Sequence, residues 1–205
     1  HWDEKKSVAG NLEQFREENL FAKASRSRVN DILSIFRQRY LTDPSVTNAL
    51  SMLVTRGFNP ESLNKLFFFH AAQADLLLHD AVTDLLASMY RLGRQEVSTN
   101  DGKVWISKQS SQGKTQGEWS DSTTTRCARE ILATLRDFGI LQGSVKKQIA
   151  PSFLPVEAFA YIALYLKQRQ ASGRKLIHDP EWQLFFAPDK VVERLFIEAH
   201  QQHLL

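Results

Sequence analysis

Residues 119–148 read WSDSTTTRCAREILATLRDFGILQGSVKKQ, and this stretch carries the strongest indication of the fold. Its hydroxyl-rich start, from Ser120 onward, supplies oxygens that can accept hydrogen bonds from the free N–H groups at the beginning of a helix. Apolar residues then recur at three- and four-residue spacing, which predicts a helix with one buried face. That face consists of Cys127, Ile131, Leu135 and Phe138, and the opposite face carries Arg126, Arg129 and Arg136.

The end of this stretch predicts a strand and a basic turn. Gly139 can end the helix, and Ile140–Leu141 has the apolar character of a short strand. Gly143–Ser144 is a turn signal, and Lys146 and Lys147 follow it. A helix, a strand and a basic turn in this order are typical of a winged helix-turn-helix, whose ligand is a nucleic acid. The alternative is that the helix is only a packing unit, since amphipathic helices that end at glycine are common.

The positive charge of the chain is concentrated in two blocks. The whole sequence has a formal net charge of +3, from 26 Lys and Arg against 23 Asp and Glu. Residues 22–40 contain five basic residues and one acidic residue, and residues 91–148 contain ten and six, so each block has a net charge of +4. A local excess of this kind suits a surface that neutralises phosphates, whereas evenly mixed charge would indicate only solubility.

The first basic block is predicted to be a helix over residues 25–41. Arg26 and Arg37 lie eleven residues apart on one flank of its apolar stripe, and Arg28 and Arg39 lie eleven residues apart on the other. Because eleven residues make about three helical turns, each pair is aligned along the axis. Two interpretations stay open. The arginines cover the edges of the core with their stems while their heads stay in water, or they bind phosphates near the helix N-terminus.

Composition bounds the class of protein. With 205 residues, of which 42% are hydrophobic and 24% charged, the chain is expected to be globular and to bury a substantial core. Its single cysteine, Cys127, excludes an intrachain disulfide and suits a reducing compartment. The most apolar region, residues 66–92, is interrupted by acidic and histidine side chains, so we expect no membrane span. No signal peptide is visible either, and these features favour a cytoplasmic protein.

The rest of the sequence predicts a mainly α-helical architecture in two lobes. Residues 1–94 are predicted as an N-terminal helical lobe, and residues 119–205 as a C-terminal helical lobe with winged-helix-turn-helix-like elements. Residues 95–118 are rich in Ser, Gly and Gln, so we expect a loop or hairpin linker there, with one short strand at Val104–Ile106. Further helices are expected from Pro44 to Gly57, from Pro60 through Phe69, from Asp75 to Leu92, from Pro155 to about Gln170, and after Pro180 and Pro188.

Catalytic and cofactor motifs are incomplete in this chain. Gly113-Lys114-Thr115 matches the end of a phosphate-binding loop, but position 108, where the first glycine of that motif belongs, is a lysine. His200 and His203 have helical spacing, yet a surface pair near a terminus explains them better than a metal site. Asp80 and Asp84 suit a solvated helix face better than the metal site of a nuclease. We therefore expect no enzymatic activity, no catalytic or metal-binding residues and no cofactor.

Two groups of aromatic residues admit alternative roles. Phe67, Phe68 and Phe69 occupy successive positions around a helix and cannot all face one core. Either that helix is buried nearly all round, or one phenylalanine contacts a partner protein. Trp105 and Trp119 border the predicted loop. They either stack on exposed bases or anchor the loop to the core, and the second role is favoured.

Short segments spread through the chain share a pattern with one known family. They are Glu18–Phe21, Ala24–Arg28, Phe36–Leu41, Leu135–Leu141, and Tyr161–Tyr165 before His178 and Trp182. In these segments the chain resembles the BrxA family, whose members are small components of the BREX bacteriophage-exclusion systems of bacteria. The resemblance extends from about Glu13 to the end, with residues 95–118 outside it. It implies a helical, non-enzymatic DNA-binding component that acts beside a DNA methyltransferase and other BREX proteins.

Together these features predict an accessory component of a phage-defence system that binds DNA largely through phosphates. The expected contacts come from both basic blocks: Arg26, Arg28, Arg37, Arg39, Arg126, Arg129, Lys146 and Lys147. Two alternatives stay open, namely a protein–protein adaptor that recruits larger defence enzymes and a sequence-specific helix-turn-helix transcription regulator. The regulator would need base-reading groups on the solvent face of the helix at 123–138, which offers arginines but few asparagines or glutamines.

Overall fold

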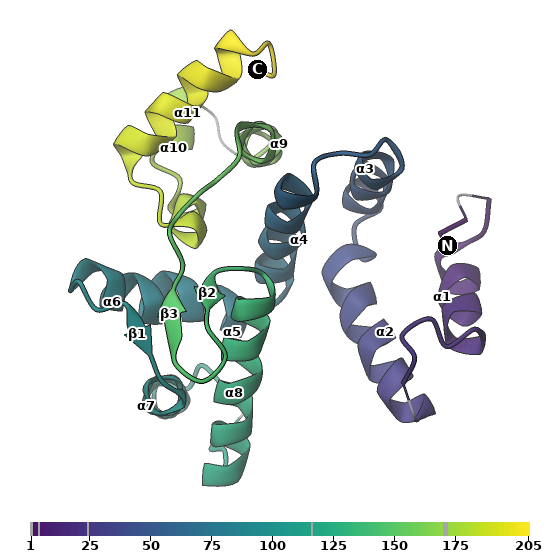
Figure 1. The fold of residues 1–205 in the computed structure, drawn as a ribbon, viewed down its shortest axis with the longest axis vertical. Coiled ribbons are helices and arrows are strands. Elements are labelled where there is room, and N and C mark those ends of the chain that lie inside the picture. The colour runs from purple at the N-terminus through teal and green to yellow at the C-terminus, as the bar shows by residue number, and fades with distance from the viewer. Residues whose placement is uncertain (1, 4, 24, 116, 170–171) are drawn as a thin grey trace.

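The computed structural model describes residues 2–3, 5–23, 25–115, 117–169 and 172–205, and the fold is mainly α-helical, as predicted from the sequence. Figure 1 shows the elements in chain order. The helices are α1 (Val8–Glu17), α2 (Arg26–Tyr40), α3 (Pro44–Thr55), α4 (Pro60–Ala74), α5 (Leu76–Asp80), α6 (Ala87–Arg91), α7 (Thr99–Ser111), α8 (Asp121–Asp137), α9 (Val156–Lys167), α10 (Gly173–Ile177) and α11 (Asp189–Gln201). A π-helical segment (Ala81–Leu86) joins α5 to α6, and a 3-10 helix (Pro180–Phe185) precedes α11.

The helix starts predicted at Pro44 and Pro60 are confirmed. The Asp43 carboxylate accepts a hydrogen bond from the Ser45 N–H at 2.8 Å, and the Asn59 side chain accepts one from the Glu61 N–H at 2.8 Å. Each cap satisfies a free backbone donor, and proline at the first helical position gives up no hydrogen bond. The helix predicted from Asp75 to Leu92 is present as α5, the π-helical segment and α6 in direct succession.

A small antiparallel sheet brackets α7 and α8 in the sequence. Its strands are β1 (Glu96–Val97), β2 (Leu141–Gln142) and β3 (Lys147–Ile149), arranged in the order β1-β3-β2. In the central strand, Lys147 pairs with Val97 of β1 and Ile149 pairs with Leu141 of β2. The strand expected at Ile140–Leu141 is therefore present, displaced by one residue. Before it, Gly139 follows the end of α8 with a φ of 71°, the left-handed conformation that glycine adopts without strain.

Residues 95–118 do not form the predicted loop or hairpin, because residues 99–111 form helix α7. Ser98 and Asp101 begin this helix by reciprocal capping. The Ser98 hydroxyl accepts from the Asp101 N–H at 3.2 Å, and the Asp101 carboxylate accepts from the Ser98 N–H at 2.8 Å. The strand expected at Val104–Ile106 is also wrong, since Trp105 and Ile106 are buried on one side of a helix. A polar composition concealed the helical spacing of the buried positions, which are Gly102, Trp105, Ile106 and Gln109.

Helix α8 is present as predicted, but its buried face is rotated from the expected one. The buried residues are Thr124, Ala128, Leu132 and Leu135. Cys127, Ile131 and Phe138 are half-buried along one flank of this stripe, where they pack against the core. The apolar pattern missed Thr124 and Ala128 because a hydroxyl and a single methyl group are weak signals of burial.

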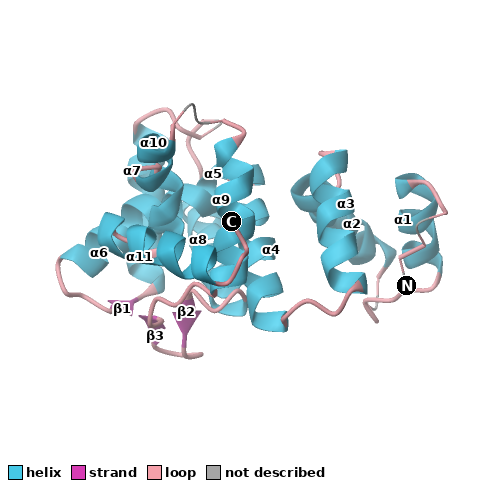
Figure 2. Ribbon diagram, turned by 90° about the horizontal axis from the view of Figure 1, so that it is seen from above, coloured by secondary structure: helices cyan, strands magenta, loops and turns pink. Residues whose placement is uncertain are grey.

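The buried apolar residues fall into two clusters. The larger cluster takes residues from α3 to α11 and thus from both sides of residues 95–118. The smaller cluster, between α1 and α2, contains Leu12, Phe15, Val29 and Leu33. Figure 2 shows α1, α2 and α3 together at one end of the molecule, with α4 beside them. The domain boundaries at residues 94 and 118 stay a prediction.

The last helices complete the larger core. Trp182 stacks on Phe159 of α9 with ring centroids 4.9 Å apart, and its Nε1 donates a hydrogen bond to the Leu176 carbonyl at 2.7 Å. Phe159 also contacts Phe196 of α11, so one aromatic residue joins the last helices to one another. Within the described ranges, every helix is too short or too polar to cross a membrane.

Candidate nucleic-acid interface

Helix α8 presents two of the predicted DNA-contacting arginines to solvent. Its start is capped by the Ser120 hydroxyl, which accepts a hydrogen bond from the Thr123 N–H at 3.2 Å. The buried side of the helix packs against α7, and the other side carries Arg126 and Arg129, which are both exposed. Neither arginine forms an ion pair with a residue that the structure describes. Both guanidinium groups are free to meet an anionic ligand.

Other basic side chains near α8 are already neutralised by acidic neighbours. The pairs are Arg136 with Asp137 at 2.7 Å, Arg94 with Asp101 at 2.8 Å, and Lys103 with Asp121. Exposed ion pairs of this kind are weak, but they lower the net charge that a phosphate meets. This contrast singles out Arg126 and Arg129 as the strongest candidates on α8.

The turn between β2 and β3 carries the two predicted lysines. Gly143 has a φ of 88°, and a β-carbon there would lie 2.2 Å from the Lys146 carbonyl oxygen, so the turn requires glycine. Lys146 is exposed, whereas Lys147 is half-buried and its Nζ donates to the Ser144 carbonyl at 3.3 Å. Val145, at 92% exposed, forms the tip of the turn. Of the two lysines, Lys146 is the better placed to reach a ligand.

Helix α2 supplies a second group of exposed arginines. The Ser25 hydroxyl caps its start by accepting from the Arg28 N–H at 3.3 Å. Arg26 and Arg28 lie in the first turn and are exposed, and Arg37 is exposed near the other end. No acidic residue in the described part of the chain pairs with any of these three.

Arg39 differs from the other arginines of α2 because it is engaged within the protein. Its guanidinium lies 3.5 Å from the Asp75 carboxylate, and the Arg39 side chain is only 18% exposed. It also lies beside Tyr40, where burial raises the phenol pKa to about 12 against the opposing effect of this guanidinium. We therefore separate Arg39 from the arginines that are free to meet a ligand.

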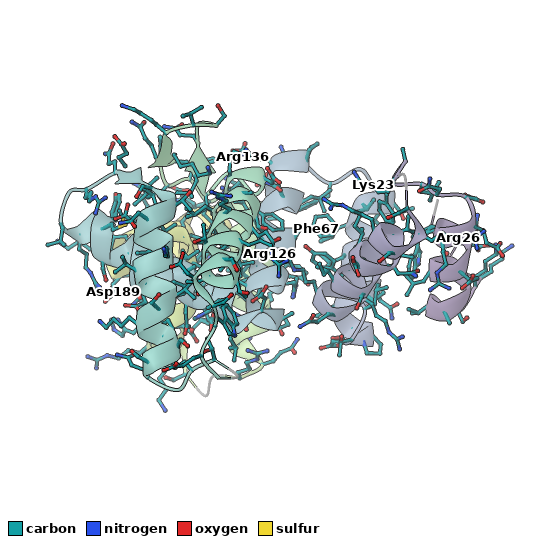
Figure 3. All side chains as sticks on the ribbon, turned by 90° about the horizontal axis from the view of Figure 1, so that it is seen from below. Lys23, Arg26, Phe67, Arg126, Arg136 and Asp189 are labelled. Carbon is teal, nitrogen blue, oxygen red and sulfur yellow. The ribbon has the colours of Figure 1, made fainter. Side chains whose placement is uncertain are left out.

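The two basic helices lie on either side of α4. In Figure 1 both α2 and α8 extend beyond the C-terminal end of α4, and they run in the same direction, so that their starts lie at the projecting end. The turn between β2 and β3 points the same way in that view. Figure 3 shows Arg126 on α8 and Arg26 on α2, with Phe67 of α4 between them. The fold thus brings basic side chains far apart in sequence to one side of the molecule.

Asp84 and two further titratable side chains, His79 and Cys127, have contacts within the protein. Asp84 accepts hydrogen bonds from Trp105 Nε1 at 2.9 Å and from Gln109 Nε2 at 3.1 Å. His79 lies within 3.3 Å of both Asp80 and Glu181, and these contacts raise its pKa. Burial raises the pKa of the Cys127 thiol, which lowers the fraction of reactive thiolate. Among the described residues, no three His, Cys, Asp or Glu side chains gather in a group that could hold a metal ion.

The phenylalanine cluster and Trp105 are accounted for by packing. Phe68 and Phe69 are fully buried, and Phe67 packs edge-on against Tyr40 of α2 at 5.2 Å between ring centroids. Helix α4 is therefore covered nearly all round, which is the first of the two interpretations. Trp105 is buried and bonded to Asp84, so it anchors its segment to the core.

The contacts of β1 and α7 around α8 were not predicted from the sequence. α7 packs along α8, and β1 pairs with the strand that follows the basic turn. The detectable signals were the Ser98–Asp101 cap and the helical spacing of Trp105 and Gln109. Both lie inside a segment whose Ser and Gln content favoured a loop.

The fold and these side chains define a mainly α-helical protein with two exposed basic helices and a three-stranded sheet beside one of them. The model of the BrxA family matches residues 1–164, and the chain belongs to this family. Membership connects the chain with the BREX systems. No curated protein and no solved structure matched in the corresponding searches.

Proposed function

We propose that this protein is a non-enzymatic DNA-binding component of a BREX system and that it holds duplex DNA largely through phosphates. The observation that carries the proposal is the pair of exposed arginines on α8, Arg126 and Arg129, which form no ion pair with the residues that the structure describes. Arginine suits this role because its planar, permanently charged head matches phosphate oxygens. The proposal also includes a cytoplasmic location beside a DNA methyltransferase and other BREX proteins.

The order of elements around α8 supports a winged helix-turn-helix. The elements follow one another as a helix (α5 to α6), a strand (β1), two helices (α7 and α8) and a β-hairpin (β2 and β3). The strand order in the sheet is β1-β3-β2. In a helix-turn-helix the second helix enters the major groove, which has room for one helix. Helix α8 corresponds to this second helix, and Arg126 and Arg129 lie on its side away from the core. The turn with Lys146 is then the wing.

A second edge of the proposed interface is α2. Arg26 and Arg28 lie in its first turn, where the partial positive charge of the helix N-terminus also favours an anion. With Arg126, Arg129 and Lys146 this makes five contacts if each side chain meets one phosphate. Four to six phosphate contacts imply a log–log salt slope of about −4 to −5.

The test is a fluorescence-anisotropy titration with unrelated duplexes of equal length and with a single strand. The proposal predicts similar affinity for all duplexes and the steep salt slope given above. No affinity at about 100 mM salt, together with a stable complex with BREX proteins, would instead support the adaptor. A strong preference for one duplex with paired half-sites would support the transcription regulator.

A further inference from the structure

The C-terminal end of the basic helix α2 is attached to the middle and the end of α4 by three polar contacts. Gln38 Nε2 donates to the Ala74 carbonyl at 3.3 Å, and Arg39 lies 3.5 Å from the Asp75 carboxylate. The Tyr40 hydroxyl donates to the Phe67 carbonyl at 3.3 Å. All three come from consecutive residues in the last turn of α2, so they act on its position together.

Asp75 also forms the start of α5. Its second carboxylate oxygen accepts a hydrogen bond from the Leu78 N–H at 3.1 Å and so caps α5. Burial is the main cause of the raised pKa of Cys127 on α8, and the charges of Glu130 and Asp75 add to it. Asp75 therefore joins the end of α2 to the start of α5.

Few residues of α2 are themselves buried, so these polar contacts, the joint between α2 and α4, contribute to the position of the helix. Among the described residues, the buried members of the cluster between α1 and α2 are Leu12, Phe15, Val29 and Leu33. From the joint, α2 extends past α4 on one side and α8 does so on the other (Figure 1). A small change of angle at Tyr40 would move Arg26 and Arg28 much further than it moves the joint, since they lie at the opposite end of the helix.

We propose that Asp75 is a positioning residue for DNA binding, which holds α2 through Arg39 so that α2 and α8 contact the same duplex. The inference rests on the proposed function and adds to it a residue that has no contact with DNA itself. The Arg39–Asp75 pair sets the spacing of two basic edges, and Tyr40 supports the same joint.

Removal of the Asp75 charge is a sharp test, because a positioning role and simple electrostatics predict opposite changes in DNA affinity. A carboxylate beside a DNA-binding surface repels phosphates, so charge alone predicts that Asp75→Asn binds DNA more tightly. Positioning predicts weaker binding, because the ion pair that fixes α2 is lost. Asparagine caps helices as well as aspartate does, so the cap on α5 is retained.

The experiment compares Asp75→Asn, Tyr40→Phe and the double variant with the native chain in anisotropy titrations across salt. We expect each single variant to weaken duplex binding about two- to fivefold, in keeping with the strength of partly exposed ion pairs and hydrogen bonds. The salt slope should become shallower by about one to two, because Arg26 and Arg28 lose their phosphates. Arg26→Ala/Arg28→Ala should weaken binding too, and adding Asp75→Asn to it should cost little more.

Asp31→Asn is the matched control. Asp31 is an exposed carboxylate on α2, and no ion pair joins it to a described residue. This variant removes the same charge without touching the joint and should bind as tightly as the native chain or more tightly. Tyr40→Phe changes no charge and keeps the ring contact with Phe67. If Asp75→Asn does not fold, Tyr40→Phe still tests whether the joint positions α2.

Native or tighter binding by both Asp75→Asn and Tyr40→Phe would overturn the inference. In that case the proposed function stands, provided that the native chain binds duplexes with a steep salt slope. A native chain without duplex affinity would overturn both. The titration of the native chain therefore distinguishes failure of the positioning role from failure of the proposed DNA binding.

Discussion

Gly102 of α7 lies directly against Ala128 of α8, so that a β-carbon at position 102 would come within 3.2 Å of the Ala128 Cβ. This distance is shorter than most contacts between such atoms, and the two helices therefore approach as closely as small residues permit. The close packing against α7 fixes the position of α8, the helix that carries Arg126.

Gly102→Val should destabilise the protein by roughly 1–3 kcal/mol, because the added methyl groups force α7 and α8 apart. Urea unfolding measures this free energy. Ser107→Val adds the same side chain to the exposed side of α7 and should change stability much less. Equal effects at both positions would show that the close approach has no energetic consequence.

Gly143→Ala should destabilise the turn between β2 and β3. Position 143 has a φ of 88°, and an alanine Cβ would lie 2.2 Å from the Lys146 carbonyl oxygen. We expect a loss of about 1–3 kcal/mol in thermal or urea unfolding. Gly113→Ala is the comparison, since Gly113 has a φ of 74° but nothing within 4 Å of the added carbon. The excess loss of stability at Gly143 over Gly113 measures the clash. Equal losses would mean that the turn between β2 and β3 rearranges without cost.

Protein stability should fall as the pH drops from 6.5 to about 4, with His70 as one cause. His70 is 3% exposed, and its ring nitrogen lies 2.9 Å from the Tyr161 hydroxyl. Burial lowers its pKa from 6.5 to about 4, and nearby Arg169 adds to this effect while Asp43 opposes it. In this pH window the unfolded chain binds the proton and the folded chain does not, so acid favours unfolding by up to about 3 kcal/mol.

His70→Gln should flatten this pH dependence, as measured by urea unfolding at several pH values between 4 and 7. His79 acts with the opposite sign: its pKa is raised, so its stabilising contribution is complete below pH 6.5 and is lost at higher pH. An unchanged slope in His70→Gln would mean that other groups cause the acid sensitivity.

Elements with local signals were predictable from the sequence. The helix starts at Pro44 and Pro60 were found because Asp43 and Asn59 cap them from neighbouring positions. The end of α8 was predictable because glycine often ends a helix, and Gly139 has the positive φ that such an end requires. Each of these features depends on residues within one helical turn, so a single sequence contains all that is needed.

Features that depend on distant partners were not predictable. One face of α7 is buried, where Trp105 bonds to Asp84 and Gly102 meets Ala128. Neither partner is visible from the Ser- and Gln-rich segment itself. Among the basic residues, the sequence could not separate Arg39 from Arg37, because Asp75 lies 36 residues further along the chain than Arg39. Which arginines are free is a property of the folded chain.

The most direct measurement is the salt-dependent duplex affinity of Arg126→Ala/Arg129→Ala. The control is Lys175→Ala/Lys190→Ala, which removes the same charge from exposed positions on α10 and α11. If both arginines bind phosphates, the variant should lose affinity for all sequences similarly, and its log–log slope should be shallower by about 1.8. The control should keep the native slope. Native affinity and slope in Arg126→Ala/Arg129→Ala would contradict the assignment of α8 as a DNA-binding helix.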